Sequence, residues 1–165
     1  MKKTTKNLPI FMIFFSVLLA LTVFLDVLKT DDGDIIMDGL KAIFGGEVAS
    51  IGSFASVVVS FSLMNFIAFF LPVILAILLF VLGGKRKKGE PINILLGLLL
   101  SASFVFSIVI INNLGMHTTG SVSVGSIGTN YNYEGSKLAI GSIFALVFSA
   151  GGILGSLFYS FDQLR

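Results

Sequence analysis

Four long apolar runs dominate this chain and leave few choices for its fold. Crossing the hydrocarbon core of a bilayer takes about 20 mostly apolar residues in a helix. The runs are continuous and not alternating, which favours helices over the strands of a membrane barrel. They cover approximately residues 8–28, 55–82, 92–111 and 138–158. The sequence therefore predicts an all-α membrane protein, a four-helix transmembrane bundle that forms a single domain over residues 1–165.

The charge content agrees with this class of protein and argues against catalysis. Only 12% of the residues are charged, about half the share of an ordinary soluble domain. The chain has no Cys and a single His, so disulfides, thiolate metal sites and a multi-histidine site within one chain are excluded. Motifs of hydrolases, metalloproteases and nucleotide-binding loops are absent. We expect a non-enzymatic protein with no catalytic residues, cofactor or metal.

The basic residues predict how the bundle sits in the membrane. Short loops on the cytoplasmic side of membrane proteins are rich in Lys and Arg. Eight of the 11 bases belong to the two termini and to the connection 83–91: Lys2, Lys3, Lys6, Lys85, Arg86, Lys87, Lys88 and Arg165. Both termini are therefore expected in the cytoplasm, with two loops outside. The expected location is the plasma (cytoplasmic) membrane of a bacterium, where Lys85, Arg86, Lys87 and Lys88 would contact anionic lipid headgroups.

Each outer loop carries a local pattern. In the first, four apolar residues share one helical face and predict a short amphipathic helix on the outer leaflet: Ile36, Leu40, Ile43 and Phe44. The second loop, 113–137, contains SVSV and NYNY, whose alternation suits a β-hairpin; a flexible loop is the alternative. Tyr131 and Tyr133 are the first candidates for contact with a partner outside the membrane.

Small residues form stripes along the last run. Gly141, Ala145, Ser149, Gly152 and Ser156 recur every three or four positions, and Gly151 and Gly155 form a second pair. Small residues let membrane helices approach closely. The stripes are interpreted either as packing against the protein's own helices or as the interface for a helix of another chain.

The second run contains an intramembrane polar residue and a proline. Asn65 is interpreted as forming an interhelical hydrogen bond, with a substrate or ion ligand as the alternative. Pro72 removes one backbone hydrogen bond and predicts a kink.

These features favour an accessory or structural subunit of a larger membrane assembly, presenting its outer loops for recognition. The expected partners are the lipid bilayer and other membrane subunits or further copies of the chain, forming an oligomer; no nucleic acid is expected. The alternative is a small oligomeric channel or carrier for a solute or ion, whose path would be lined by Asn65, by the Pro72 kink and by the serines of the third run, Ser101, Ser103 and Ser107.

Overall fold

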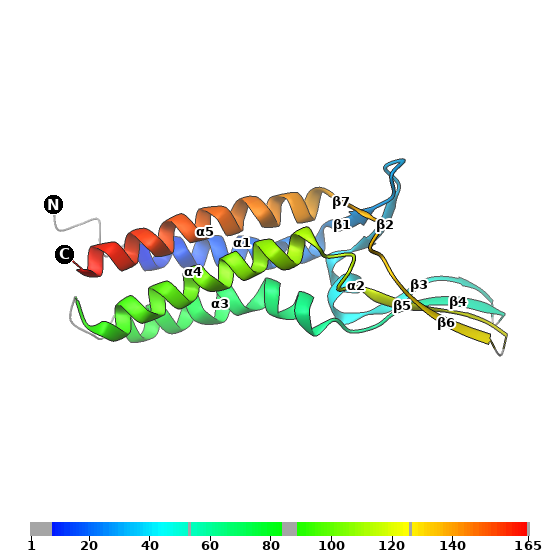
Figure 1. The fold of residues 1–165 in the computed structure, drawn as a ribbon, viewed down its shortest axis with the longest axis horizontal. Helices are drawn as coiled ribbons and strands as arrows, with labels where there is room; N and C mark the ends of the chain where they lie inside the picture. Colours follow the sequence, from blue (N-terminus) through cyan, green and yellow to red (C-terminus); the bar gives the residue numbers. More distant parts are fainter. Residues whose placement is uncertain (1–7, 53, 84–88, 126, 165) are drawn as a thin grey trace.

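The computed structural model describes residues 8–52, 54–83, 89–125 and 127–164, and it combines a group of helices with two antiparallel sheets (Figure 1). The prediction of an all-α four-helix transmembrane bundle is therefore wrong. The described residues include seven strands, and three helices are long and apolar enough to cross a membrane. Those three helices are compatible with a membrane protein. The first apolar helical segment, Leu8–Phe24, is shorter.

The helices are α1 (Leu8–Leu21), continued by a 3-10 turn η1 (Thr22–Phe24), α2 (Gly39–Phe44), α3 (Leu63–Gly83), α4 (Pro91–Asn112) and α5 (Ile140–Leu164). The four longer helices lie side by side, with α1 packed on α3 and α5, and α4 packed on the same two helices. The start of α1 and the end of α5 lie at one end of this group, and all the strands lie at the other (Figure 1).

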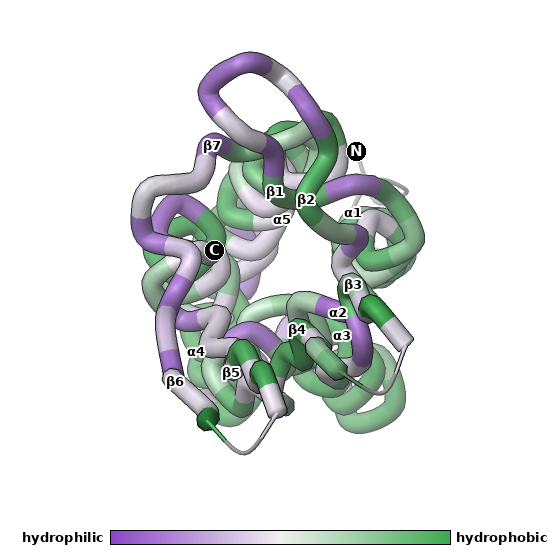
Figure 2. Tube along the Cα trace, turned by 90° about the vertical axis from the view of Figure 1, so that its right-hand side faces the viewer, coloured by the Kyte–Doolittle hydropathy of each residue, from purple (hydrophilic) through white to green (hydrophobic). Residues whose placement is uncertain are grey.

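The strands are β1 (Asp26–Lys29), β2 (Ile35–Asp38), β3 (Gly46–Ile51), β4 (Ala55–Val59), β5 (Thr119–Val124), β6 (Ile127–Asn132) and β7 (Lys137–Leu138). They form a three-stranded sheet in the order β2-β1-β7 and a four-stranded sheet in the order β3-β4-β5-β6. The described residues within 26–59 and 119–138 are called the headpiece below. In the end-on view of Figure 2, hydrophilic segments gather in the headpiece, in front of mostly hydrophobic helices.

Two predicted membrane spans were too long because each included a strand. The first run leaves helical geometry at Leu25, which has φ −104° and ψ 163°, and continues as β1. The second run begins with β4, whose β-branched residues Val57–Val59 pair with β5 before α3 starts. β-branched residues pack well on a pleated sheet. In a hydropathy profile, however, they are as apolar as the residues of a membrane helix, so the predicted span included them.

The local patterns in the two predicted outer loops correspond in part to observed elements. Helix α2 includes Leu40, Ile43 and Phe44 of the predicted helical face, whereas Ile36 lies in strand β2; Gly45, with φ +80°, follows the last residue of α2. This helix buries Ala42 and Ile43, whereas Leu40 and Phe44 are exposed. Strands β5 and β6 form the hairpin in the second loop, with Val124 opposite Ile127 across the turn.

The outward surface of the helices is apolar, and their interior combines apolar side chains with many polar ones. Exposed side chains include Phe11, Phe14, Ile74, Phe80, Val105 and Val147. The buried polar residues include Ser16, Ser101, Ser103, Ser107, Ser142, Ser149, Ser156 and Ser160. A protein in water would reverse this arrangement, whereas hydrocarbon around the helices favours it.

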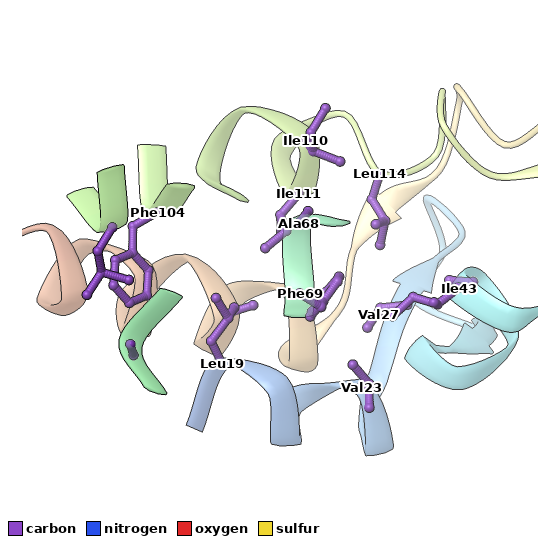
Figure 3. Close-up of a cluster of buried hydrophobic side chains, with 14 of the residues drawn as sticks. Leu19, Val23, Val27, Ile43, Ala68, Phe69, Phe104, Ile110, Ile111 and Leu114 are labelled. Carbon is purple, nitrogen blue, oxygen red and sulfur yellow. The ribbon is translucent and has the colours of Figure 1, made fainter. Parts of the chain in front are cut away.

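One continuous core joins the helices to the headpiece. Figure 3 follows it from Phe104 and Leu19 between the helices, through Phe69, to Val27 and Ile43 beneath the strands. Each of these five side chains is fully buried. The headpiece is therefore fixed to the helical end by packing as well as by its chain connections.

Candidate recognition surface on the headpiece

The four-stranded sheet has two chemically different faces, because residues directly opposite each other on neighbouring strands point to the same side. One face is polar and includes Ser50, Ser56, Ser121, Ser123, Asn130 and Asn132; on it the hydroxyls of Ser56 and Ser123 are hydrogen-bonded at 2.8 Å. The other face is apolar and includes Ile51, Ala55, Val57, Val59, Val122, Val124 and Ile127.

The apolar face is covered only where it meets the helices. Val59, at this base, is 2% exposed. At the tip, a row across the four strands joins Ile51, Ala55, Val124 and Ile127. Ile51 is 75% exposed and Ile127 is 73% exposed. Large apolar side chains grouped at an exposed tip are a common feature of protein interaction sites.

A hollow of about 430 Å³ lies beside the base of the same sheet. Its lining contains no charged residue and comprises Ser60, Thr119, Gly120, Asn130, Tyr131 and Asn132. Three consecutive residues of the lining belong to β6, the last strand in the sheet order. The hollow therefore adjoins the outer strand of the sheet.

The two tyrosines predicted to contact a partner interact with each other. Their hydroxyls are 2.6 Å apart and their rings meet edge to face at 5.0 Å. Tyr131 also lies over Gly120, its cross-strand partner, where a Cβ would be 3.1 Å from the Tyr131 ring. Burial and the hydrogen bond with Tyr131 both raise the pKa of Tyr133, because each favours its neutral hydroxyl over the phenolate. Both rings are half-buried, and the more exposed side chains are at the tip.

Asn65 lies at the junction of helices and headpiece, in the first turn of α3, and is fully buried. Its amide nitrogen donates to the carbonyl oxygen of Ala42 at 2.9 Å and to the Thr118 hydroxyl at 3.0 Å. The Ser62 backbone N–H donates to the carbonyl of Ile43 at 2.9 Å. The start of α3 thus provides donors to the last carbonyls of α2, which lack partners within a short helix.

The connection after α4 is held by the same junction. The Ser62 hydroxyl donates to the carbonyl of His117 at 2.7 Å, and the Thr118 hydroxyl donates to the carbonyl of Leu114 at 2.8 Å. Asn65 therefore ties together three segments that are distant in sequence: α2, α3 and the chain entering β5. We refer to Ala42, Ser62, Asn65, His117 and Thr118 as the junction cluster.

Pro72 lies inside α3, and α4 supplies the hydrogen bond that it cannot make. Proline has no N–H, so the carbonyl of Ala68, four residues earlier, loses its donor. The Ser107 hydroxyl donates to this carbonyl at 2.5 Å and shares its proton with the carbonyl of Ser103 at 2.9 Å. The proline and the serine therefore act as a pair across two helices.

Replacing Ser107 should test this pairing. Ser107→Ala is expected to destabilise the protein by about 1 kcal/mol, because the Ala68 carbonyl loses its partner in a dry environment. In a Pro72→Ala background the backbone can supply that donor, so the same replacement should cost less. Unfolding of the four proteins in mixed detergent micelles gives the coupling energy. Ser103→Ala is the control, because the Ser103 hydroxyl bonds to the Leu100 carbonyl of its own helix; its cost should be the same with and without Pro72. An equal cost of Ser107→Ala in the two backgrounds would refute the pairing.

The small residues of α5 lie against the protein's own helices and strands. A Cβ on Gly151 would be 2.6 Å from the ring of Phe15 in α1, and a Cβ on Gly152 would overlap the ring of Phe104 in α4. Gly141 meets Leu25 and the backbone of Asp26. Ala145, Ser149 and Ser156 are fully buried, and Gly155 has Met12 at 3.6 Å from its Cβ position.

The proposed lipid contacts Lys85, Arg86, Lys87 and Lys88 lie outside the described residues. Among the described residues that follow them in sequence, the Gly89 N–H and the Asn93 amide donate to the side-chain oxygen of Gln163, at 3.0 Å and 3.5 Å. These bonds join the end of α5 to the start of α4. Among the described residues, no group of three or more His, Cys, Asp or Glu side chains could hold a metal ion.

The sequence missed the most exposed part of the recognition surface. Ile51 and Phe54 flank a tight turn at Gly52, which has φ +56°, and Phe54 is 67% exposed. Gly52 was the available signal, but Ile51 and Phe54 were left within the first predicted outer loop, before the run drawn from residue 55, and neither was singled out.

Comparison of the chain with models of protein families, with curated proteins and with solved structures found no match.

Proposed function

We propose that this protein is a non-enzymatic subunit of a membrane assembly, in which the headpiece binds the extramembrane part of another membrane protein. The observation that carries the proposal is the exposed apolar tip of the four-stranded sheet, formed by Ile51, Phe54, Val124 and Ile127. Burying such a tip against a partner would remove apolar surface from water, at about 25 cal/mol per Å². The continuous core beneath the strands supports a headpiece that keeps its shape before binding.

The proposed setting is the cytoplasmic membrane of a bacterium. The helices α3, α4 and α5 would cross it, and the shorter α1, which packs on α3 and α5 and leads from the opposite end into the headpiece, would cross beside them. The bases cluster in sequence at the termini and the α3–α4 connection, and the start of α1 and the end of α5 lie together at the end opposite the strands. The positive-inside rule then favours a cytoplasmic location for that end and an outside location for the headpiece.

This orientation can be tested by thiol labelling, because the chain has no Cys of its own. In intact cells, a membrane-impermeant maleimide should label Asp32→Cys, in the exposed turn between β1 and β2. Leu164→Cys, exposed at the end of α5, should be labelled only after permeabilisation. The reverse pattern would place the headpiece in the cytoplasm.

The binding role can be tested with one charge placed on either face of β3. Ile51→Asp should abolish co-purification of partner subunits from native membranes, because the carboxylate would lose its water in the interface. Ser50→Asp puts the same charge on the neighbouring residue of the opposite, polar face, and should leave the partners bound. Native mass spectrometry of gently solubilised complexes gives the subunit composition. If the unaltered protein carries no partner, or if Ile51→Asp keeps it, the proposed binding surface is wrong.

The carrier alternative has less support from the geometry. Asn65 lies in the first turn of α3, and its amide nitrogen donates to the Ala42 carbonyl and the Thr118 hydroxyl. The serines Ser103 and Ser107 donate to backbone carbonyls of the protein's own helices. These groups therefore stabilise packing where a path for a solute would need them to bind it.

A further inference from the structure

The four-stranded sheet ends in two edge strands with different chemistry. The edge strand β3 contains Glu47 and has an irregular register between Glu47 and Ala49. A charge and a bulge both discourage pairing with a further strand. The opposite edge strand, β6, reads IGTNYN, with no charge, no proline and a regular register along its six residues. Only β6 therefore lacks these protective features.

Strand β6 has one neighbour in the described part of the chain, β5. Five of its six residues are exposed, from Ile127 to Asn130 and at Asn132. In an antiparallel sheet every second residue of an edge strand directs its N–H and C=O groups away from its neighbour. These groups form a template for one more strand.

We infer that β6 is the site at which an extended, uncharged segment of a partner subunit adds a strand to the sheet. The inference rests on the proposed function, since it specifies how the headpiece would bind its partner. Main-chain hydrogen bonds would supply affinity, and the hollow beside Asn130 and Asn132 would receive a side chain of the added strand. The side-chain pattern of β6 specifies the rest of the chemistry.

The two faces of β6 define the partner's pattern. Ile127, Thr129 and Tyr131 lie on the side of the apolar face, and Gly128, Asn130 and Asn132 lie on the polar face. An added strand that continues both faces has β-branched residues on one side and Ser, Thr or Asn on the other. Strand β5, TGSVSV, has this pattern and already pairs with β6 on its other side. Because β6 has no charged residue, a charged segment would gain no electrostatic attraction from this strand.

A second copy of the chain fits this edge less well. The strands of the four-stranded sheet run lengthwise, in the same general direction as the helices (Figure 1). Two copies in one membrane have the same orientation, so their β6 strands would meet in parallel. A two-fold axis along the strands would also place the apolar face of one sheet on the same side as the polar face of the other. A partner segment can instead run antiparallel and match both faces.

The test uses a peptide that copies β5 as the probe. The peptide TGCVSV carries an activated cysteine at the position of Ser121, the residue opposite Asn130 in the β5–β6 pair. It is added to the full-length protein in detergent, carrying either Asn130→Cys on β6 or Ser50→Cys on β3. Both sites are exposed and lie on the polar face, so neither change should affect folding, which circular dichroism will verify.

The mixed disulfide should form at least about tenfold faster with Asn130→Cys than with Ser50→Cys, a preference of about 1.4 kcal/mol for the β6 edge. A peptide with alternate amides N-methylated has the same side chains but lacks the donors, and should lose this preference. Equal rates at the two edges, or an unchanged preference with the methylated peptide, would overturn the inference.

The two proposals fail in distinguishable ways. The peptide experiment contains no partner subunit, so its result is independent of co-purification from membranes. Selective reaction at β6 without any co-purified subunit would support the strand-addition site and count against the proposed function. A partner that is lost with Ile51→Asp, together with equal peptide rates, would keep the proposed function and refute strand addition at β6.

Discussion

Gly152→Ala is expected to destabilise the protein more than the same replacement at the other glycines of α5. The new Cβ would overlap the ring of Phe104, which is fully buried between α4 and α5. A ring that is enclosed on all sides cannot move aside without shifting its neighbours. Overpacking of this kind costs about 1–3 kcal/mol, and we expect the upper part of that range. Unfolding in mixed detergent micelles, followed by circular dichroism, measures the loss.

Gly155→Ala is the matched control, one helical turn away. A Cβ there would lie 3.6 Å from Met12, an ordinary van der Waals contact. Both variants gain the same helix propensity from Gly to Ala, so the difference between them isolates the contact. Gly152→Ala should also be rescued in part by Phe104→Leu, which shortens the obstructing side chain. Equal stabilities for the two alanine variants would show that the α4–α5 contact is not close-packed at Phe104.

The apolar pattern of the sequence located the helices well but misplaced their ends. The run predicted at 92–111 matches α4 to within one residue at each end, whereas α5 continues six residues beyond the run predicted at 138–158. The second run was drawn from residue 55 because Val57–Val59 are as apolar as the helix that follows them. A hydropathy profile shows that a segment is apolar, but it does not distinguish a membrane helix from a strand that packs against a core.

Pairing between distant segments could not be read from local periodicity. Strand β4 lies between α1 and α3, and β5 lies between α4 and α5, yet Ala55 lies opposite Val124. The alternation in SVSV predicted a hairpin, which needs only neighbouring residues, and that hairpin is present as β5 and β6. The β4–β5 pair depends on α3 and α4 returning the chain to the same end of the molecule. The sheet, and the exposed face it creates, therefore followed only from the three-dimensional structure.

The misplaced boundary also changed the interpretation of Asn65. In a predicted membrane span from 55 to 82, Asn65 lay well inside the membrane. In the structure, Asn65 is the third residue of α3 and faces the headpiece. The predicted interhelical hydrogen bond is present, but it joins α3 to the short helix α2 at Ala42, and a second bond goes to Thr118 before β5. Between the long helices α3 and α4, Ser107 donates to the Ala68 carbonyl that Pro72 leaves without a donor.

Asn65→Leu should loosen the headpiece while leaving the helices in place. The carbonyl of Ala42 and the hydroxyl of Thr118 would each lose a donor in a fully buried site. An unsatisfied buried polar group costs about 1–3 kcal/mol, and we expect a loss of about 2 kcal/mol in the free energy of unfolding. Hydrogen exchange should accelerate most in α2 and β5, the segments that the junction cluster holds together, and least in the centre of α4.

Asn113→Leu is the control for the loss of an amide. Asn113 is exposed, and its amide donates only to the Val109 carbonyl of the preceding turn. Surface changes of this kind usually shift stability by less than about 0.5 kcal/mol. If Asn65→Leu exchanged like Asn113→Leu, the packed core alone would hold the headpiece on the helices. If exchange rises in α2 and β5 together, one buried amide couples the two outer loops, and a partner bound to the sheet would act on the helices through the junction cluster.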